Sequence, residues 1–459
     1  MPAPISPAAR ATYDHDAAHV FRPWSKQSGL DPMVVEGAKG TVVTDSEGRD
    51  YLDFGSQLVY VNVGHGNPRV AAAIAEEAGR LATIQPAMAV ASRSEAARLV
   101  AKHLPEGMNK VFFTNGGADA VEHAIRMARL HTGRYKVLSA YRGYHGATQQ
   151  AMTTSGDPRR FANDYGVGGN VHFFGPFLYR SAYNATTEAE ECERALAALE
   201  DLIVFEGPST IAAFIMETIP GTAGIMPPPP GYLAGVRELC DRYGIVMILD
   251  EVMAGFGRTG SWFAFEHYDV VPDLVTFAKG VTSGYVPMGG VGVHDRIVET
   301  FAEKPYPGGL TYSGHPLASA AAVAAIGFME DEGVVDNARR IGEEVLGPGL
   351  AELAERHPCV GEVRGLGCFF GLDLVRNPET REPLSPYGTV GPESAAIVAA
   401  CRDAGLLVFP NMHRIHLCPP LTVTDDEVRR ALEILDRALL IGDEAVEAAT
   451  GAVPAEVTA

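Results

Sequence analysis

The chain has 459 residues, of which 46% are hydrophobic, so it can bury a large core, and its length favours two or three compact units. Its net charge of −20 and the lack of a long Lys/Arg run exclude nucleic acid as a partner. The opening residues have no signal-peptide pattern, and the longest bland stretch, residues 317–329, is too short to cross a bilayer. We therefore expect a soluble, cytoplasmic protein without membrane contact. The cysteines form no close CxxC pair, so we expect no metal site.

The first flank, residues 1–65, is expected to contain a β-meander. Its segment TVVTDSEGRDYLDF has two strand-like runs around a turn at Ser46-Glu47-Gly48. The following unit, residues 66–325, is expected to form a large domain. Between Val111 and Gly284 short apolar runs alternate with helical patterns, which indicates parallel strands joined by crossover helices. The expected strands are KVFFT, YKVLSA, AAFIMET, GIVMILDE and DLVTFAK.

Polar groups follow the apolar part of each expected strand. These groups are Asn115-Gly116-Gly117, Tyr141 to His145, Glu217, Asp250 and Lys279. In open α/β sheets the ligand lies beyond the carboxyl ends of the strands, so we expect these groups to converge on one site.

The second flank, from residue 326, holds helical patterns and a strand-like GCFFGLDLV. It then has a polar loop over residues 376–392 and an amphipathic helix over residues 424–440. We expect residues 1–65 and 326–445 to form one small α+β domain. We expect residues 446–459 to be a disordered tail.

Lys279 and Asp250 indicate the chemistry. A lysine directly after an apolar strand is either a snorkelling side chain or a desolvated amine of the kind that Schiff-base chemistry requires. Asp250 follows the buried run 245–249, and a buried acid needs a partner. One such partner is the protonated ring nitrogen of a pyridine cofactor. The alternative, a metal-binding or Walker-B acid, is weak because no phosphate-loop motif precedes it.

A phosphate site is expected at TNGGADAVEHAIRMAR. Gly116 and Gly117 let the backbone approach an anion, and the following helix offers unpaired N–H groups. Tyr144 could stack on a planar cofactor or could be a loop tyrosine with its hydroxyl in solvent. Val252 could cover the opposite face of the ring.

The order of motifs resembles the class III, or omega, aminotransferase family of pyridoxal-phosphate (PLP) fold type I. The resemblance spans nearly the whole chain. Its marks are TNGGADAVEHAIRMAR, YRGYHGAT, LDEVMAGFGRTG, FAKGVTSGYVPMGG and GLTYSGHPLASAAA. It implies an α/β fold with a mainly parallel seven-stranded sheet in a large domain and a smaller domain from both termini.

The resemblance also implies site residues. Lys279 forms the Schiff base, Asp250 partners the ring nitrogen, and Tyr144 and Val252 flank the ring. Other implied cofactor contacts are the backbone of Gly116, Gly117 and Ala118, the side chains of His145 and Glu217, and Thr311. Glu217 has an alternative role, as a strand-end carboxylate satisfied by backbone amides. Thr311 is implied to reach the cofactor phosphate of the other subunit, so the resemblance implies a homodimer with shared active sites, with a tetramer left open.

The substrate side departs from the family pattern. Phe409 stands where many relatives have a carboxylate-binding arginine. Arg414 is the candidate substitute, with a solvated loop arginine as the alternative. Val59, followed by Tyr60, stands where several relatives have Trp, which suggests a roomier pocket. Trp24, in HVFRPWSKQ, resembles the subgroup for taurine and related omega-amino acids.

The predicted function is PLP-dependent transamination by a ping-pong scheme. The donor is an omega-amino acid or primary amine, taurine-like, β-alanine-like or arylalkyl, and the acceptor is pyruvate or 2-oxoglutarate. The alternatives are another fold type I reaction, decarboxylation or amino-group migration, and a non-catalytic scaffold, which the presence of Lys279 and Asp250 disfavours.

Overall fold

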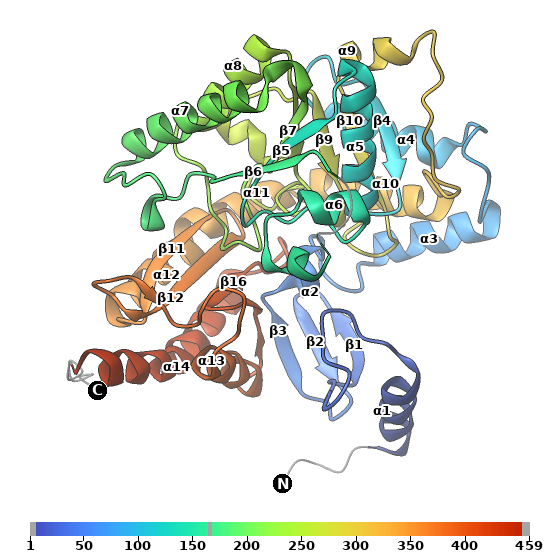
Figure 1. Ribbon diagram of the computed structural model, residues 1–459. Coiled ribbons are helices and arrows are strands. Elements are labelled where there is room, and N and C mark those ends of the chain that lie inside the picture. The colour runs from blue at the N-terminus through green and yellow to red at the C-terminus, as the bar shows by residue number, and fades with distance from the viewer. Residues whose placement is uncertain (1–5, 164–167, 452–459) are drawn as a thin grey trace.

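The central layer of the molecule is a seven-stranded sheet, seen in the computed structural model, which describes residues 6–163 and 168–451 (Figure 1). In order across the sheet, the strands are β4 (Lys110–Thr114), β10 (Gly289–Val293), β9 (Leu274–Phe277), β8 (Val246–Asp250), β7 (Ile211–Glu217), β5 (Lys136–Ala140) and β6 (Asn170–Phe173). β10 runs antiparallel to both of its neighbours, and the other neighbouring pairs are parallel. The mainly parallel seven-stranded sheet is therefore confirmed, and all five expected strands are present.

Helices cover both faces of this sheet (Figure 1). Ala213 and Ile215 of β7 pack in one buried cluster with the apolar face of α5, whereas Phe214 and Met216 of the same strand pack in the cluster that includes α7 and α8. The strands are apolar throughout because neither face meets solvent. The helices of this unit are α3 (Pro68–Arg80), α4 (Ala91–Lys102), α5 (Gly117–Thr132), α6 (Gln149–Thr154), α7 (Glu188–Glu206), α8 (Tyr232–Tyr243), α9 (Asp295–Val298) and α10 (Pro316–Asp331).

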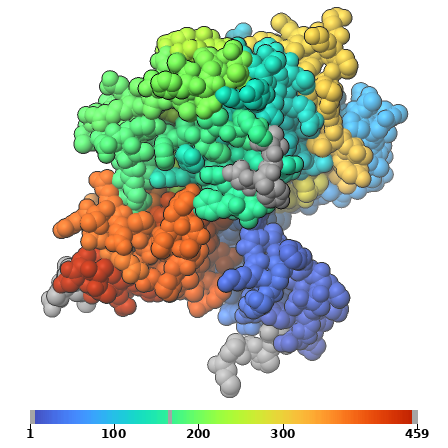
Figure 2. Space-filling model, in the orientation of Figure 1, coloured from blue at the N-terminus to red at the C-terminus, as the bar shows by residue number. Residues whose placement is uncertain are grey.

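The two flanks form two smaller sheets. One contains β1 (Val35–Lys39), β2 (Val42–Asp45), β3 (Asp50–Asp53) and β14 (Leu406–Leu407). The other contains β11 (Val360–Leu366), β12 (Phe369–Asn377), β16 (Arg414–Leu417) and β15 (Phe409–Asn411), with β13 (Glu382–Pro383) beside β12. β14 lies parallel to β3, with Leu406 opposite Leu52, so the C-terminal flank completes the N-terminal sheet. Both flanks lie on the same side of the central unit, in blue and orange in Figure 2.

The remaining helices belong to the flanks. They are α1 (Pro7–His19), α2 (Ser56–Val59), α11 (Val334–Ile341), α12 (Gly347–Arg356), α13 (Pro392–Asp403) and α14 (Asp425–Thr450). α14 begins as expected after Thr424, whose hydroxyl accepts a hydrogen bond from the Glu427 amide. The helix extends to Thr450, so the expectation of a disordered tail is wrong for residues 446–450, and residues 452–459 lie outside the described part of the chain. Within residues 6–163 and 168–451, no helix has the length and apolar character needed to span a membrane.

Candidate active site

A cavity of about 630 Å³ lies at the carboxyl ends of β7, β8 and β9. Many of the residues that line it were singled out from the sequence. Those lining it are Gly116, Gly117, Ala118, Tyr144, His145, Glu217, Asp250, Val252 and Lys279, together with Trp24, Tyr60 and Phe409. The parallel register brings them together, since Glu217 and Asp250 are paired neighbours across β7 and β8 and Asp250 pairs with Thr276 of β9.

Lys279 lies where the chain turns sharply out of the sheet. It directly follows Ala278 after β9, and its backbone has a φ of 44°, which non-glycine residues rarely adopt. Burial lowers the pKa of the Lys279 amine, and the nearby carboxylates of Glu217 and Asp250 oppose that effect. A lysine whose pKa is lowered holds more of the neutral amine, which is the form that attacks a carbonyl.

Asp250 is fixed at the end of β8 by two contacts. Its Oδ2 lies 2.7 Å from His145 Nδ1, and its Oδ1 accepts a hydrogen bond from the Val252 amide at 3.0 Å. Burial alone would lower the pKa of His145, but the hydrogen bond to Asp250 and its charge outweigh burial and raise it. These two contacts hold the Asp250 carboxylate in one orientation.

Glu217 joins two loops beside the cavity. Its Oε1 accepts from the Tyr144 amide and its Oε2 from the Gly221 amide, each at 2.9 Å. Burial raises the pKa of Glu217, and the charge of His145 opposes the rise. Glu217 thus lines the cavity and is also satisfied by backbone amides, so the two roles weighed from the sequence are compatible.

The second carboxylate of the LDEV motif has a different environment. Glu251 is fully buried and accepts hydrogen bonds from the Thr218 hydroxyl and from the amides of Ala264 and Phe265. Burial raises the pKa of Glu251 to about 7. Glu251 therefore joins the loop after β8 to the end of β7, and Asp250 alone faces the cavity.

The N-terminus of α5 opens onto the cavity without a side-chain cap. Gly116 precedes it in an extended conformation, and no side chain of the described residues caps it. A Cβ added at Gly117 would lie 2.8 Å from Val252 Cγ1, so only glycine permits this close approach of the two loops. Uncapped amides at a helix N-terminus are suited to a phosphate group.

Arg159 is a cavity residue that sequence reasoning missed. Its guanidinium carbon lies 3.4 Å from the centroid of the Tyr144 ring, and it also contacts Asp157 and Thr222 Oγ1. The available signal was its place in the polar segment SGDPRRF, which follows the YRGYHG motif in a chain with few basic residues. Leu58 was also missed, and it lines the cavity beside Tyr60.

Two predicted residues lie away from this cavity. Val59 is 1% exposed and packs against Ile219, Met253 and Phe369, so its expected place in the pocket wall is wrong. The reason is that Ser56, Gln57 and Val59 all have positive φ, which breaks the regular alternation of side chains. Thr311 is exposed and does not line the cavity of its own chain.

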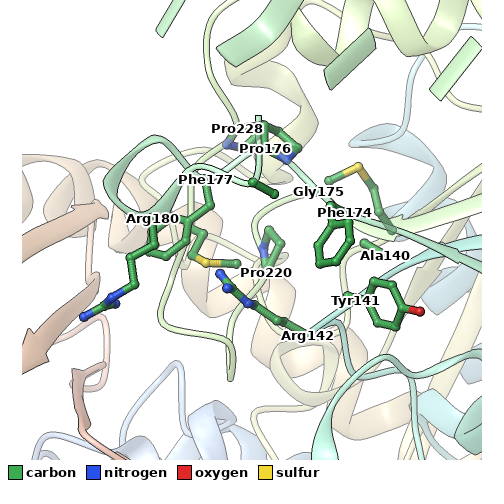
Figure 3. A pocket seen from close by; sticks show the side chains of 13 residues that line it. Ala140, Tyr141, Arg142, Phe174, Gly175, Pro176, Phe177, Arg180, Pro220 and Pro228 are labelled. Atoms are coloured by element: carbon green, nitrogen blue, oxygen red, sulfur yellow. The ribbon is translucent and has the colours of Figure 1, made fainter. Parts of the chain in front are cut away.

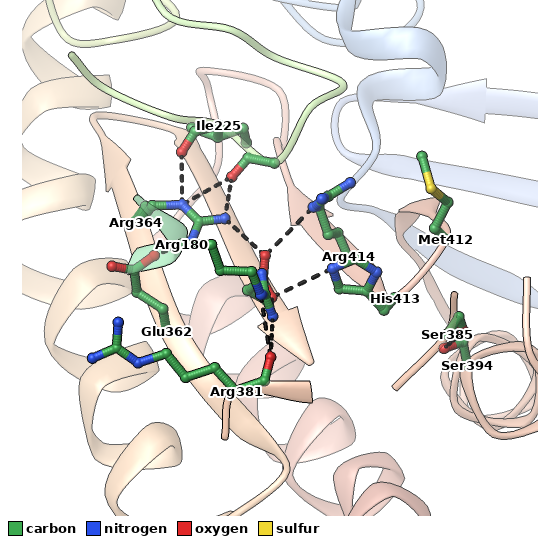
Figure 4. Close-up of polar contacts among 12 residues, drawn as sticks. Arg180, Ile225, Glu362, Arg364, Arg381, Ser385, Ser394, Met412, His413 and Arg414 are labelled. Carbon is green, nitrogen blue, oxygen red and sulfur yellow. Dashed lines mark hydrogen bonds and ion pairs between the residues drawn. The ribbon is translucent and has the colours of Figure 1, made fainter. Parts of the chain in front are cut away.

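Arg414 also lies outside the cavity lining and is only 4% exposed, so the alternative of a solvated loop arginine is wrong. Its Nε lies 3.4 Å from Asp373 Oδ2. Figure 4 shows Arg414 next to His413 in this polar cluster, which also contains Arg180 and Arg364. Asp373 is buried and also pairs with Arg180 and Arg364. The terminal nitrogens of Arg414 form no hydrogen bond with the described part of the chain.

A second, much smaller cavity lies beside the Tyr141 loop (Figure 3). It measures about 30 Å³ and is lined mainly by apolar side chains, with Arg142 pointing into it between Phe177 and Pro220. This volume accommodates water but no cofactor. Of these two cavities, only the larger has room for an organic cofactor together with a substrate.

The fold and the larger cavity together define a fold type I PLP-dependent transferase. Residues 25–439 match the family described as Aminotransferase class-III. A taurine–pyruvate aminotransferase of Rhodobacter capsulatus is 34% identical, over 95% of this chain and 98% of its own. A putrescine–pyruvate aminotransferase of Pseudomonas aeruginosa is also 34% identical, over 91% and 93%.

Among solved structures, one similar chain is a taurine:2-oxoglutarate aminotransferase from Bifidobacterium kashiwanohense, in complex with PLP and glutamate. It has a TM-score of 0.92 and 42% identity, and the match covers 95% of this chain and 98% of that one. The protein belongs to the class III aminotransferase family and is a PLP-dependent aminotransferase.

The residues of the larger cavity fit PLP. The uncapped start of α5 suits its phosphate, the oriented carboxyl group of Asp250 suits its ring nitrogen, and Lys279 suits its aldehyde carbon. Tyr144 and Val252 offer an aromatic and an apolar surface for the faces of the ring.

Proposed function

We propose that this aminotransferase takes its amino group from an omega-amino acid whose far end is anionic, such as taurine or β-alanine, and passes it to pyruvate or 2-oxoglutarate. The observation that carries the proposal is Arg159, a guanidinium in the wall of the cavity that also contains the Lys279 amine. Arginine binds sulfonate and carboxylate groups through paired N–H donors.

The environment of Arg159 leaves part of its charge for a ligand. Asp157 is its charged partner on one side. Arg159 also donates to the neutral hydroxyl of Thr222, and the flat face of its guanidinium lies on the Tyr144 ring. Trp24 and Leu58 add an apolar surface at the mouth of the same cavity. The similarity to aminotransferases named for taurine supports this donor class.

The roles of the chain's own residues follow from their positions. PLP, when bound, supplies the electron sink that lets a C–H bond next to the amine ionise. Lys279, with its lowered pKa, would remove that proton and return it to the carbon that was the cofactor's aldehyde. Asp250, oriented by His145, would hold the proton on the ring nitrogen. Tyr144 and Val252 would fix the plane of the ring, and Gly116, Gly117 and Ala118 would hold the phosphate.

The test follows the absorbance of the bound cofactor in the purified holoenzyme. Taurine, β-alanine and 1-phenylethylamine are added separately, and pyruvate or 2-oxoglutarate is added afterwards. We expect the anionic donors to bleach the cofactor band and an oxo acid to restore it. Bleaching by 1-phenylethylamine alone would refute the proposed donor class, and Lys279→Ala controls for non-catalytic colour loss.

We propose further that Arg414 binds the carboxylate of the oxo acid. Its terminal nitrogens have no partner in the described ranges, and its strand β16 pairs with β15, which carries the cavity residue Phe409. Arg414→Ala should raise the KM of the oxo acid about tenfold or more, because a charged hydrogen-bond pair is lost. An unchanged KM would eliminate this role, and Arg402→Ala on the exposed end of α13 serves as the control.

We also propose a cytoplasmic homodimer in which Thr311 reaches the phosphate site of the partner. Thr311 is exposed, and large apolar side chains near the cavity mouth and beside Thr311 are exposed as well: Trp24, Leu58 and Tyr312. Such surfaces mark protein contacts. Mixing inactive Lys279→Ala chains with Thr311→Lys chains should restore activity in hybrid dimers, because one of the two sites is then intact. A monomer by sedimentation would exclude this assembly.

A further inference from the structure

Among residues 6–163 and 168–451, Arg258 is the largest fully buried side chain, and it forms no ion pair with a carboxylate of these residues. Its guanidinium donates to four neutral oxygens there: the carbonyls of Cys368 and Pro419, Asn62 Oδ1 at 2.8 Å and Ser56 Oγ at 3.4 Å. Burial lowers the pKa of Arg258, the charge of Asp53 opposes that effect, and Nε has no hydrogen-bond partner in the described part of the chain. A buried charge without a directly bonded carboxylate is costly and therefore calls for an explanation.

Arg258 contacts both ends of the segment that forms one wall of the active-site cavity. Ser56 and Asn62 bracket this segment, and between them Leu58 and Tyr60 face the cavity. The backbone of this segment is strained, because Ser56, Gln57 and Val59 all have positive φ. One guanidinium thus restrains both ends of a strained loop.

The same network reaches the backbone next to Lys279. Asn62 donates to the Phe256 carbonyl at 2.8 Å. A Cβ added at Gly280, the residue after Lys279, would collide with Asn62 Nδ2 and with Phe256. Asn62, held by Arg258, is therefore packed directly against the turn that carries the catalytic amine.

Arg258 also ties the C-terminal flank to this turn. The Cys368 amide donates to the Arg258 carbonyl at 3.0 Å, and Ser56 Oγ donates to the Cys418 carbonyl at 2.6 Å. Four stretches of chain distant in sequence, near residues 56–62, 256–258, 368 and 418–419, therefore meet at one side chain.

We propose that Arg258 is a positioning residue that holds the wall segment 56–62 against the Lys279 turn and so sets the width of the substrate pocket. It touches neither cofactor nor substrate, and it acts through Asn62 and Ser56. The inference concerns the geometry of the pocket and holds for whichever donor the enzyme uses.

The first test measures kinetics for the donor that the wild-type enzyme uses best in the panel above. Arg258→Met should raise its KM about tenfold and lower kcat less, because the wall that binds the donor moves more than the lysine does. The KM of Arg258→Lys should lie between that of the wild type and that of Arg258→Met, since an ammonium reaches only some of the four oxygens. Arg237→Met is the control: Arg237 is also largely buried, but it pairs with Asp273 at the opposite edge of the sheet.

The second test is hydrogen–deuterium exchange, which does not depend on activity. In the holoenzyme, Arg258→Met should speed amide exchange selectively in residues 55–63 and 279–284, whereas Arg237→Met should leave those peptides at the wild-type rate. Where Arg258→Met does not fold, Asn62→Ala supplies the same readout, because it keeps the guanidinium and removes its link to Gly280. Two results would overturn the proposal. One is amide exchange that is faster by the same factor over the whole chain, and the other is a donor KM within twofold of wild type in both Arg258→Met and Asn62→Ala.

Discussion

The two sides of the active-site cavity are built in different ways. On the cofactor side, Glu217, Asp250 and Lys279 stand at or just after the ends of neighbouring buried strands, and the register of the sheet fixes their spacing. On the substrate side, Trp24, Leu58 and Phe409 come from the two flanks, through segments with positive φ such as residues 56–59. The sheet gives the chemistry a rigid frame, and the flanks can vary the donor without disturbing it.

The largest expected effect lies on the sheet side. Lys279→Ala removes the only amine in the cavity lining, so kcat/KM should fall by roughly four orders of magnitude. Loss of cofactor bleaching by the donor measures the effect. Lys110→Ala, at an exposed position at the start of β4, should match wild type. A Lys279→Ala enzyme that keeps more than a tenth of wild-type activity would show that the cofactor side of the cavity does not carry the chemistry.

Asp250→Asn should lower kcat/KM by about 10²- to 10³-fold, because the neutral amide no longer stabilises a charged ring nitrogen. Steady-state kinetics of the loaded holoenzyme measure the change. The matched control is Asp273→Asn, at the opposite end of the sheet, where the carboxylate pairs with Arg237. Asp273→Asn should lose thermal stability while keeping kcat. A similar loss of kcat in Asp250→Asn and Asp273→Asn would show that the carboxyl ends of the strands are not specifically required for catalysis.

On the substrate side, Arg159→Met should raise the KM for taurine about 10- to 100-fold, as expected for loss of a charge-assisted hydrogen bond. The KM for 1-phenylethylamine should change little, because that amine has no anionic end. Equal changes for both donors would show that Arg159 acts through Tyr144 and the cofactor instead of through the substrate.

Adjacent residues of the wall segment should respond differently. Val59→Ala should cost about 1–2 kcal/mol of unfolding free energy through lost burial, with the donor range unchanged. Leu58→Ala, at a half-exposed cavity residue, should change the donor KM a few-fold with little effect on Tm. Thermal unfolding and donor kinetics on both variants separate the two effects, and the reverse pattern would contradict the observed side-chain directions.

The smallest effect concerns the stability of the flank. His357 Nδ1 lies 2.6 Å from Asp443 and its Nε2 lies 2.9 Å from Asp436, both on α14. Burial alone would lower the pKa of His357, but the two carboxylates outweigh burial and raise it. A raised folded-state pKa gives stabilisation that is complete below the unfolded value of about 6.5 and is lost as the pH rises through the folded value.

As the pH rises from about 6.5 through the raised folded-state pKa of His357, the Tm of the wild type should therefore decline more than that of His357→Gln. Differential scanning fluorimetry across the range measures the difference. Parallel curves for the two proteins would show that His357 stays in one protonation state in the folded protein.

Sequence patterns predicted the sheet side well because its signals are local: an apolar strand, then a polar group. They missed β10, whose GGVGV segment has three glycines and little strand propensity, and β6, whose NVHF segment is short and half polar. The predicted end of α14 was early because Gly442 resembles a stop signal. In the structure Gly442 packs against Cys359, where a Cβ would collide, and the helix continues.

The substrate side could not be predicted because its geometry depends on distant contacts. The direction of Val59 follows from φ values that Arg258 and Asn62 help to hold, and those partners are about 200 residues apart in the chain. The burial of Arg414 depends on Asp373 of another strand. No periodicity in a short window contains this information.

The pairing of β14 with β3 has a consequence for biosynthesis. Leu52 leaves the ribosome about 350 residues before its partner Leu406 does. The N-terminal sheet therefore waits with an open edge while the intervening chain is made, and its completion depends on a contact of very high sequence separation. Nascent chains released before residue 406 should retain that exposed strand and be captured by chaperones, even where the central sheet has already folded.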